Sequence, residues 1–321
     1  MGTLQRVTWQ KLAISIPCYF AFIKAIIVAI NIDNIVQQIE LTTGYVLKNY
    51  RLNSIGGGSI NDAYQLHSDQ HTYFIKLNRP QLSAMFEAEA LGLAEMRALN
   101  CVRIPEVICH GQTAEHSYIV LEYIQLGSLR GQANKLLGSQ LAQLHRQPQP
   151  YYGWPINNPI GSTPQHNDRE HDWLSFWQHH RLGQQLTFAT QNGFAGRLQD
   201  KGEKLLAHLH VFFENYTPIP ALLHGDLWGG NVGADPQGTP VIFDPACYYG
   251  DRETDIAMTE LFGGFGTDFL AAYQAEYPLD AGYKTRKTLY NLYHILNHVN
   301  LFGSGYVGQA EAMLGQLLSE I

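Results

Sequence analysis

The chain has 321 residues, of which 45% are hydrophobic and 15% charged, and its formal net charge is −7. This composition is ordinary for a globular protein and excludes a largely disordered chain, while the length allows two modest domains. The negative charge argues against nucleic acid as the main partner, because binding a phosphate backbone requires a basic face. A neutral or cationic substrate fits better.

The N-terminal segment and the cysteines bear on the compartment. Residues 12–32 (LAISIPCYFAFIKAIIVAINI) could cross a bilayer, but Lys24 lies at their middle, where a charge costs about 2.5–3.5 kcal/mol. We therefore favour an N-terminal extension of unknown role, covering residues 1–33, over a membrane contact through 12–32. The cysteines have neither CxxC nor metal-like spacing, which favours reduced, mostly buried thiols in a cytoplasmic protein. They are Cys18, Cys101, Cys109 and Cys247.

Helix and strand patterns alternate in the first third of the chain. Residues 33–44 predict a short helix that ends at Gly44, with Ile35, Val36, Ile39 and Leu41 on one side. Three β-prone segments, at 45–55, 60–68 and 71–78, predict antiparallel strands. Residues 85–99 predict a helix with Phe86, Leu91, Leu93 and Leu99 as its apolar residues. Two further strands are expected at 103–111 and 117–124.

The pattern changes after residue 125. Helices are expected at 129–147, 171–189 and 196–216, with a loop at 148–170, short strands within 221–245 and mostly helix after that. We therefore predict an α+β protein with two lobes. Residues 34–125 would form a small lobe with an antiparallel sheet and one helix, and residues 126–321 a larger, mainly helical lobe. The ligand site would lie between them.

The sequence HGDLWGGN, at residues 224–231, has the His-x-Asp-x-x-x-x-Asn spacing of a kinase catalytic loop. In such a loop the aspartate, here Asp226, accepts the proton of an attacking hydroxyl, and the asparagine, here Asn231, binds magnesium. Asp244 ends a predicted strand thirteen residues after Asn231 and would complete a two-ligand magnesium clamp.

Two upstream features fit a nucleotide site. The segment SIGGGSI lies between predicted strands, where its small residues would let the backbone close over phosphates, although such a turn is also common in ordinary hairpins. Its candidate residues are Gly56, Gly57, Gly58 and Ser59. Lys76 lies on the third strand, where a kinase's phosphate-binding lysine belongs. Of the two glutamates on the following helix we favour Glu89 as its partner, because Glu87 could equally be solvated.

These motifs occur together with others that are typical of one family. The stretches HGDLWGGN, FDPACYYGDRE, ELFGGF and NLYHILNHVNLFG, together with GGGSINDAY, FEAEALGL and NPIGSTPQHN, resemble the fructosamine kinase (ketosamine-3-kinase) family over residues 35–308. The resemblance implies a protein-kinase-like fold. It also implies that ATP phosphorylates the sugar 3-hydroxyl of ketosamines, such as fructosamine or ribulosamine adducts on lysine or other amines. The phosphate destabilises the adduct, so the amine is repaired.

The resemblance also assigns roles to residues in matching motifs. Asp226 would be the base, Asn231 and Asp244 the Mg²⁺ ligands, and Lys76 the contact to the α- and β-phosphates of ATP. The partner would be a small ketosamine or a glycated protein lysine.

Further roles concern adenine and the sugar. Glu122 and Tyr123 would offer backbone groups to adenine, and Trp228 and His298 would face the sugar. Many family members have a cysteine where this chain has Ser59, so we do not predict thiol-linked dimerisation.

Several alternatives stay open. Asp255 is expected to be a buried carboxylate that holds the catalytic loop, with Asp251 nearer the substrate, although both could belong to a solvated charge run. His294 and His298 have the spacing of a metal-binding pair, but a core or substrate-facing role is favoured. The acceptor could instead be an aminoglycoside or a choline-like metabolite. A nucleotide-binding pseudokinase is disfavoured because all four catalytic positions are intact.

Overall fold

The computed structural model describes residues 31–56 and 60–321. The proposed extension at 1–33 and the apolar stretch at 12–32 therefore lie almost wholly outside the described residues, as do Gly57, Gly58 and Ser59. None of the helices in the described ranges is both long and apolar enough to cross a membrane. The described cysteines are unpaired thiols, and two of the three are buried, as expected.

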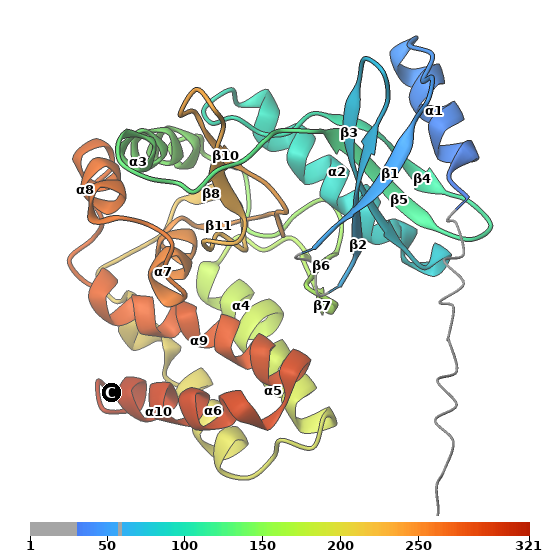
Figure 1. Cartoon of the computed structure of the whole chain (residues 1–321). Coiled ribbons are helices and arrows are strands. Elements are labelled where there is room, and N and C mark those ends of the chain that lie inside the picture. The colour runs from blue at the N-terminus through green and yellow to red at the C-terminus, as the bar shows by residue number, and fades with distance from the viewer. Residues whose placement is uncertain (1–30, 57–59) are drawn as a thin grey trace, which may run out of the picture.

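A five-stranded antiparallel sheet with two helices forms one end of the molecule (Figure 1). Its strands, in spatial order, are β1 (Arg51–Ile55), β2 (Asp62–His67), β3 (Thr72–Asn78), β5 (Ser117–Glu122) and β4 (Val107–Gln112). The helices are α1 (Asp33–Thr43) and α2 (Ser83–Ala98), and the short 3₁₀ turn η1 (Pro80–Leu82) precedes α2. We call this part the N-terminal lobe and the remainder the C-terminal lobe.

Both faces of the sheet are covered, which explains the unbroken apolar run in β5. Val120 belongs to the core beneath α1, whereas its neighbours Ile119 and Leu121 belong to the core that α2 shares with the C-terminal lobe. Successive residues of a strand point to opposite faces, so a strand buried on both sides has no polar alternation. Lys76, on the adjacent strand β3, is the buried charge that this apolar setting must accommodate.

Two details of the predicted N-terminal lobe are wrong. The first strand begins at Arg51 rather than residue 45, because Asn49 has a left-handed backbone (φ 53°) that interrupts an extended segment. Before it, the Leu47 amide donates to the Glu40 side chain at 2.7 Å. Leu41 is 73% exposed, so it does not lie on the buried side of its helix.

The C-terminal lobe is mainly helical, with short two-stranded antiparallel sheets beside the helices (Figure 1). The helices are α3 (Gln132–His145), α4 (Trp173–Trp177), α5 (Gly183–Gln191), α6 (Arg197–Leu206), α7 (Glu253–Leu261), α8 (Thr267–Glu276), α9 (Tyr283–Phe302) and α10 (Val307–Leu318). Two of the sheets are hairpins, β6 (Asn158–Ile160) with β7 (Thr163–Gln165) and β9 (Val232–Ala234) with β10 (Pro240–Ile242), and the third pairs β8 (Pro220–Leu223) with the distant β11 (Tyr248–Asp251). Short 3₁₀ turns lie at η3 (Leu209–Phe213) and η4 (Ser304–Tyr306).

Two expectations for this lobe are corrected. The predicted loop at 148–170 contains the β6–β7 hairpin. The predicted helix at 171–189 is divided by a π-helical turn, η2 (Gln178–Leu182). Gly183 permits this turn, because a Cβ there would lie 2.4 Å from the Gln178 carbonyl oxygen.

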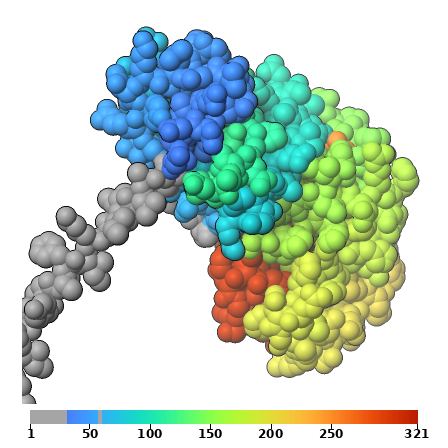
Figure 2. Space-filling model, turned by 90° about the vertical axis from the view of Figure 1, so that its right-hand side faces the viewer, coloured from blue at the N-terminus to red at the C-terminus, as the bar shows by residue number. Residues whose placement is uncertain are grey.

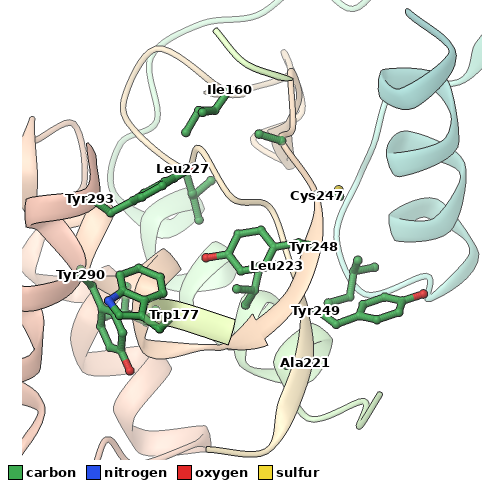
Figure 3. Packing of buried hydrophobic residues seen from close by; sticks show 14 of the residues in the cluster. Ile160, Trp177, Ala221, Leu223, Leu227, Cys247, Tyr248, Tyr249, Tyr290 and Tyr293 are labelled. Carbon is green, nitrogen blue, oxygen red and sulfur yellow. The ribbon is translucent and has the colours of Figure 1, made fainter. Parts of the chain in front are cut away.

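An aromatic core supports the segment that carries the HGDLWGGN motif. Figure 3 shows Trp177 and Tyr290 near Leu223, which ends β8 just before the motif. The rings of Trp177 and Tyr290 meet edge to face with centroids 4.9 Å apart. Leu223 and Leu227 are fully buried on either side of Asp226. Burying two leucines contributes several kcal/mol, so the core fixes both ends of this short loop.

The two lobes are joined by contacts near the predicted boundary. Arg103, in the N-terminal lobe, forms ion pairs with Glu122 and with Asp235 of the β9–β10 hairpin. Just after this boundary, within the C-terminal lobe, the backbones of Gly127 and Ala234 exchange two hydrogen bonds, of 2.8 and 3.0 Å. The space-filling view in Figure 2 shows the lobes packed against each other. The boundary near residue 125 remains a prediction.

Candidate active site

The loop that follows β8 is held by a single buried carboxylate. Asp255, on α7, accepts hydrogen bonds from the backbone N–H groups of His224 at 2.7 Å and Gly225 at 2.9 Å. The ring of His145 also contacts Asp255 and is itself buried. These contacts confirm the structural role expected for Asp255. Two otherwise unpaired amides are thereby satisfied in the core.

Gly225 lets this loop pass close to the segment that follows Asp244. Its φ of +79° is in the left-handed region, and a Cβ on this residue would lie 2.1 Å from the Ala246 carbonyl oxygen. The backbones are also joined by a hydrogen bond of 2.8 Å from the Ala246 amide to the His224 carbonyl. The glycine of the HGD motif is therefore required by a close backbone approach.

Asp226 and Asn231 face each other across the loop. The Asn231 side-chain amide donates to the Asp226 carbonyl oxygen at 2.8 Å and to its carboxylate Oδ2 at 3.1 Å. Burial raises the pKa of the Asp226 carboxyl to about 7, and the negative charge of Asp244 adds to this effect. A half-buried carboxylate with this proton affinity can accept a proton from a hydroxyl group.

Lys76 joins three separate elements of the site. Its ammonium lies 2.8 Å from Oε1 of Glu89 on α2 and 2.7 Å from Oδ1 of Asp244. The preference for Glu89 over Glu87 as the helix partner is therefore confirmed. Burial alone would lower the pKa of Lys76, but the charges of Asp244 and Glu89 raise it above its ordinary value. The lysine consequently stays charged in the core.

Asp244 adopts a backbone conformation that is uncommon for its residue type. Its φ is +59°, one of three positive values at non-glycine residues in the described ranges. The side chain is 50% exposed at the surface of the site. Burial would raise the pKa of Asp244, but Lys76 outweighs this effect and lowers it below its ordinary value. Such left-handed residues are frequent at functional sites.

The donor atoms at Asn231 and Asp244 suit a hard divalent cation. The Asn231 nitrogen is fully engaged in hydrogen bonds, including a contact of 3.4 Å to the Asp244 carbonyl, which leaves its oxygen for a metal. Lys76 contacts one oxygen of Asp244 and leaves the other. Mg²⁺ prefers such oxygen ligands and is commonly completed by phosphate and water. In the part of the chain that the structure describes, no three His, Cys, Asp or Glu side chains cluster as a metal site, and His294 with His298 forms none.

Trp228 and His298, the two residues predicted to face the sugar, both pack against the ring of a third residue. Trp228 is 39% exposed, and its ring packs over Gly230. Phe262 lies between them, with its ring centroid 6.4 Å from Trp228 and 4.9 Å from His298. Phe262 was not among the predicted site residues, although the ELFGGF stretch that contains it was recognised.

The prediction that Asp251 lies near the substrate is wrong. Its side chain is completely buried behind the site, and its two oxygens accept hydrogen bonds from the hydroxyls of Tyr216 and Tyr290. The Glu253 amide donates to it as well, at 3.0 Å. Asp251 therefore stabilises the start of α7.

The adenine assignment stays a prediction for Glu122. Its amide donates to the Glu106 carbonyl at 2.8 Å and its side chain pairs with Arg103, so of its backbone groups the carbonyl would have to serve adenine. The role of Tyr123 remains a prediction, as does that of Gly56, the one described member of the glycine-rich segment.

Sequence patterns did not indicate Glu95, which links α2 to the C-terminal lobe. Its carboxylate accepts hydrogen bonds from the Trp154 indole at 2.9 Å and from the Tyr249 hydroxyl at 2.6 Å. On the same face of α2, Gly92 lies against Cys247, whose sulfur would be 2.9 Å from a Cβ at this position. The spacing Glu89-x-x-Gly92-x-x-Glu95 could have suggested one helix face with a common role.

A strand lysine paired with a helix glutamate, beside an HxDxxxxN loop and a second aspartate, defines a phosphotransferase site on a two-lobe, protein-kinase-like fold. The sequence profile of the fructosamine kinase family matches residues 31–320. The chain belongs to this family.

Named relatives cover most of the chain. A Synechocystis protein named "probable ketoamine kinase" is 46% identical over 287 residues, covering 89% of this chain and 96% of the relative. An Arabidopsis thaliana protein named chloroplastic protein-ribulosamine 3-kinase is 41% identical and covers 88% of this chain and 87% of its own.

Solved structures agree with this fold. A Haemophilus somnus crystal structure described as a "putative fructosamine-3-kinase" has a TM-score of 0.81 and 30% identity, covering 88% of this chain and 96% of that chain. The aminoglycoside phosphotransferase APH(4)-Ia, in a ternary complex with AMP-PNP and hygromycin B, has a TM-score of 0.60 and 14% identity. That match covers 90% of this chain and 98% of the phosphotransferase, and it supports the fold alone.

Proposed function

We propose that the protein transfers the γ-phosphoryl group of ATP to the sugar 3-hydroxyl of a ketosamine, a reaction that leads to removal of the sugar from the amine. The observation that carries this proposal is the double ion pair of Lys76 with Glu89 and Asp244. This double ion pair would form the phosphate-binding side of a kinase site next to the Asp226–Asn231 pair. The names of relatives with more than 40% identity supply the acceptor class.

Each charged residue has a distinct part in this transfer. Lys76 would bind the α- and β-phosphates, while Glu89 keeps its ammonium in place. Asp226 would orient the acceptor hydroxyl and accept its proton as the phosphoryl group is transferred in line. Catalysis of this kind depends chiefly on positioning and charge neutralisation. Asp255 holds the amides of the catalytic loop and thereby keeps Asp226 in place.

Asn231 and Asp244 would hold Mg²⁺, which would neutralise charge on the phosphates. Their free oxygens fit this ion, as described above. Asp244 would then exchange part of its contact with Lys76 for the metal, because the phosphates also attract the lysine.

The acceptor's amine suits the surroundings of Asp226. Trp228 presents a partly exposed indole two residues from Asp226, and aromatic faces attract ammonium groups. The net charge of −7 also favours a cationic acceptor over an anionic one.

The proposal is tested by ATP consumption with purified full-length protein and Mg²⁺. Ribulose-lysine, fructose-lysine and an aminoglycoside would be offered in parallel, with Asp226→Asn as the inactive control. Turnover restricted to the two ketose-amines supports the proposal. Turnover of the aminoglycoside alone would assign a different acceptor class, and tight MgATP binding without any turnover would indicate a pseudokinase.

A further inference from the structure

A row of aromatic side chains runs outward from the catalytic loop. The ring centroids of Trp228 and Phe262 lie 6.4 Å apart, and those of Phe262 and His298 lie 4.9 Å apart. The His298 ring is in turn 5.3 Å from Phe302 and 5.0 Å from Tyr306. We call these five residues the aromatic row.

The outer end of the aromatic row is exposed. Phe302 is 57% exposed, Phe262 is 40% exposed, and Tyr306 is half-buried. A contiguous group of exposed apolar side chains commonly marks a binding surface. The transfer step proposed above uses the inner end of the row and assigns nothing to Phe302 or Tyr306.

The inner end of the row is fixed to the catalytic loop by glycines. A Cβ on Gly264 would lie 2.5 Å from the Cα of Gly229, and one on Gly229 would lie 3.0 Å from the Gly263 carbonyl oxygen. No side chain fits between the two loops, so the segment that follows Phe262 is held against the segment that follows Trp228. The row is therefore continuous with the catalytic loop rather than a separate patch.

The outer end of the row lies where the two lobes meet. A Cβ on Gly161, at the tip of the β6–β7 hairpin, would be 3.0 Å from Cδ1 of Leu301 and 3.2 Å from Cδ1 of Ile60. Leu301 precedes Phe302 at the end of α9, and Ile60 follows the glycine-rich segment in the sequence. In Figure 2 the C-terminal segment (red) is at the surface below the N-terminal lobe (blue to cyan).

We propose that Phe302 and Tyr306 bind the alkyl chain of the acceptor when the ketose is carried by a lysine of a peptide or protein. This inference rests on the proposed function. The secondary ammonium next to the ketose would face Trp228, and the methylenes beyond it match the outer aromatic surface, which buries apolar groups. The net charge of −7 adds long-range attraction for such a cationic acceptor. The row thus selects ketoses on the long side chain of lysine over ketoses on small amines.

The test compares two acceptors that carry the same ketose. One is fructosyl-lysine within an N-acetylated peptide, and the other is fructosyl-methylamine. In the double variant Phe302→Ala, Tyr306→Ala we expect kcat/KM for the peptide to fall about tenfold through a higher KM, because the lysine methylenes lose two aromatic contacts. For the methylamine adduct, which carries the same ammonium but no longer alkyl chain, we expect a change of less than about twofold, because its methyl group ends before these rings.

Two controls accompany the double variant. Tyr306→Phe keeps the aromatic face and should retain the preference for the peptide. Leu41→Ala removes an exposed apolar side chain from α1, on the other lobe, and should leave kcat/KM unchanged for both acceptors. Thermal unfolding of each variant checks that the fold is retained.

The remaining outcomes are distinct. If the double variant loses kcat/KM equally for both acceptors, or for neither, the inference is overturned. The proposed function would still stand in that case, because the wild-type protein phosphorylates the ketosamines. If the wild-type protein phosphorylates neither adduct, the proposed function fails and the inference fails with it.

Discussion

The Glu95 carboxylate accepts a hydrogen bond from the Tyr249 hydroxyl at 2.6 Å, which ties the last turn of α2 to strand β11. Glu89, earlier on the same helix, contacts Lys76. The position of Lys76 is thus coupled to a contact with the C-terminal lobe. Glu95 is accordingly a positioning residue, which acts on the site through the helix.

Replacing Glu95 by Ala should therefore impair phosphoryl transfer, although the proposed reaction places no substrate against Glu95. We expect kcat to fall about tenfold, corresponding to roughly 1.4 kcal/mol of lost positioning. The decisive measurement is a double-mutant cycle with Glu89→Gln. If Glu95 acts through Glu89, its effect should largely disappear in that background, whereas an additive loss would assign it a separate structural role.

Asp226→Asn should preserve folding and reduce turnover by several orders of magnitude. The substituted amide keeps an oxygen that can accept from Asn231, so the loop retains its contact. Steady-state kinetics and thermal unfolding, measured on the same preparation, separate the two effects. Near-normal activity of this variant would show that Asp226 is not the base.

Asp255→Asn should mainly destabilise the protein. The amide has one acceptor oxygen where the carboxylate offers two, so one of the His224 and Gly225 N–H groups loses its partner in the core. We expect a loss of about 2–3 kcal/mol in the free energy of unfolding by urea. Glu203→Gln, an exposed substitution on α6, should change this value by less than about 0.5 kcal/mol.

Gly225→Ala and Gly238→Ala form a matched pair. Both glycines have φ near +80°, but a Cβ meets the Ala246 carbonyl oxygen at Gly225 and open space at Gly238. Gly238→Ala should cost about 1–2 kcal/mol from its backbone conformation alone. Gly225→Ala should cost clearly more and should also reduce kcat. Equal losses of unfolding free energy would contradict the close approach of the two segments.

We expect the buried side chain of His294 to make the stability of the fold sensitive to acid pH. Burial lowers the pKa of this residue to about 3, whereas an unfolded histidine titrates near 6.5. Below pH 6.5 the unfolded state binds a proton that the folded state excludes. The free energy of unfolding should therefore fall with decreasing pH, by up to about 1.4 kcal/mol per pH unit.

Urea denaturation between pH 7 and pH 4.5 measures this slope. His294→Gln should give a shallower dependence than the wild-type protein, while His210→Gln, at an exposed position, should reproduce the wild-type curve. Parallel curves for all three proteins would show that His294 does not contribute.

The loop that carries Asp226 and Asn231 could be predicted from local sequence, because the spacing of these two residues and His224 lies within eight consecutive positions. The succession of strands and helix along the N-terminal lobe and the Lys76–Glu89 pair were also predictable, since kinase-like motifs recur in a fixed order along the chain. Leu41 was misplaced because helical periodicity indicates where the apolar side of a helix lies but not how wide that side is.

Contacts between distant parts of the chain were not predictable in this way. Glu95 meets residues that are 59 and 154 positions away, so no local pattern connects them. Asp251 was misassigned because a motif does not reveal whether a carboxylate faces the site or the core. Only the fold shows that the tyrosines Tyr216 and Tyr290 surround it.

The Lys76–Asp244 contact would also affect whether a nucleotide enters the proposed site with or without a bound metal ion. One ammonium is shared by two carboxylates, and Asp226 adds a third acidic group nearby, so acidic groups outnumber the lysine. A bare polyphosphate approaching this region meets repulsion that a divalent counter-ion would cancel. In the proposed reaction the site would therefore disfavour metal-free ATP before any chemistry begins, because the charges of its own residues would set the requirement for an ion.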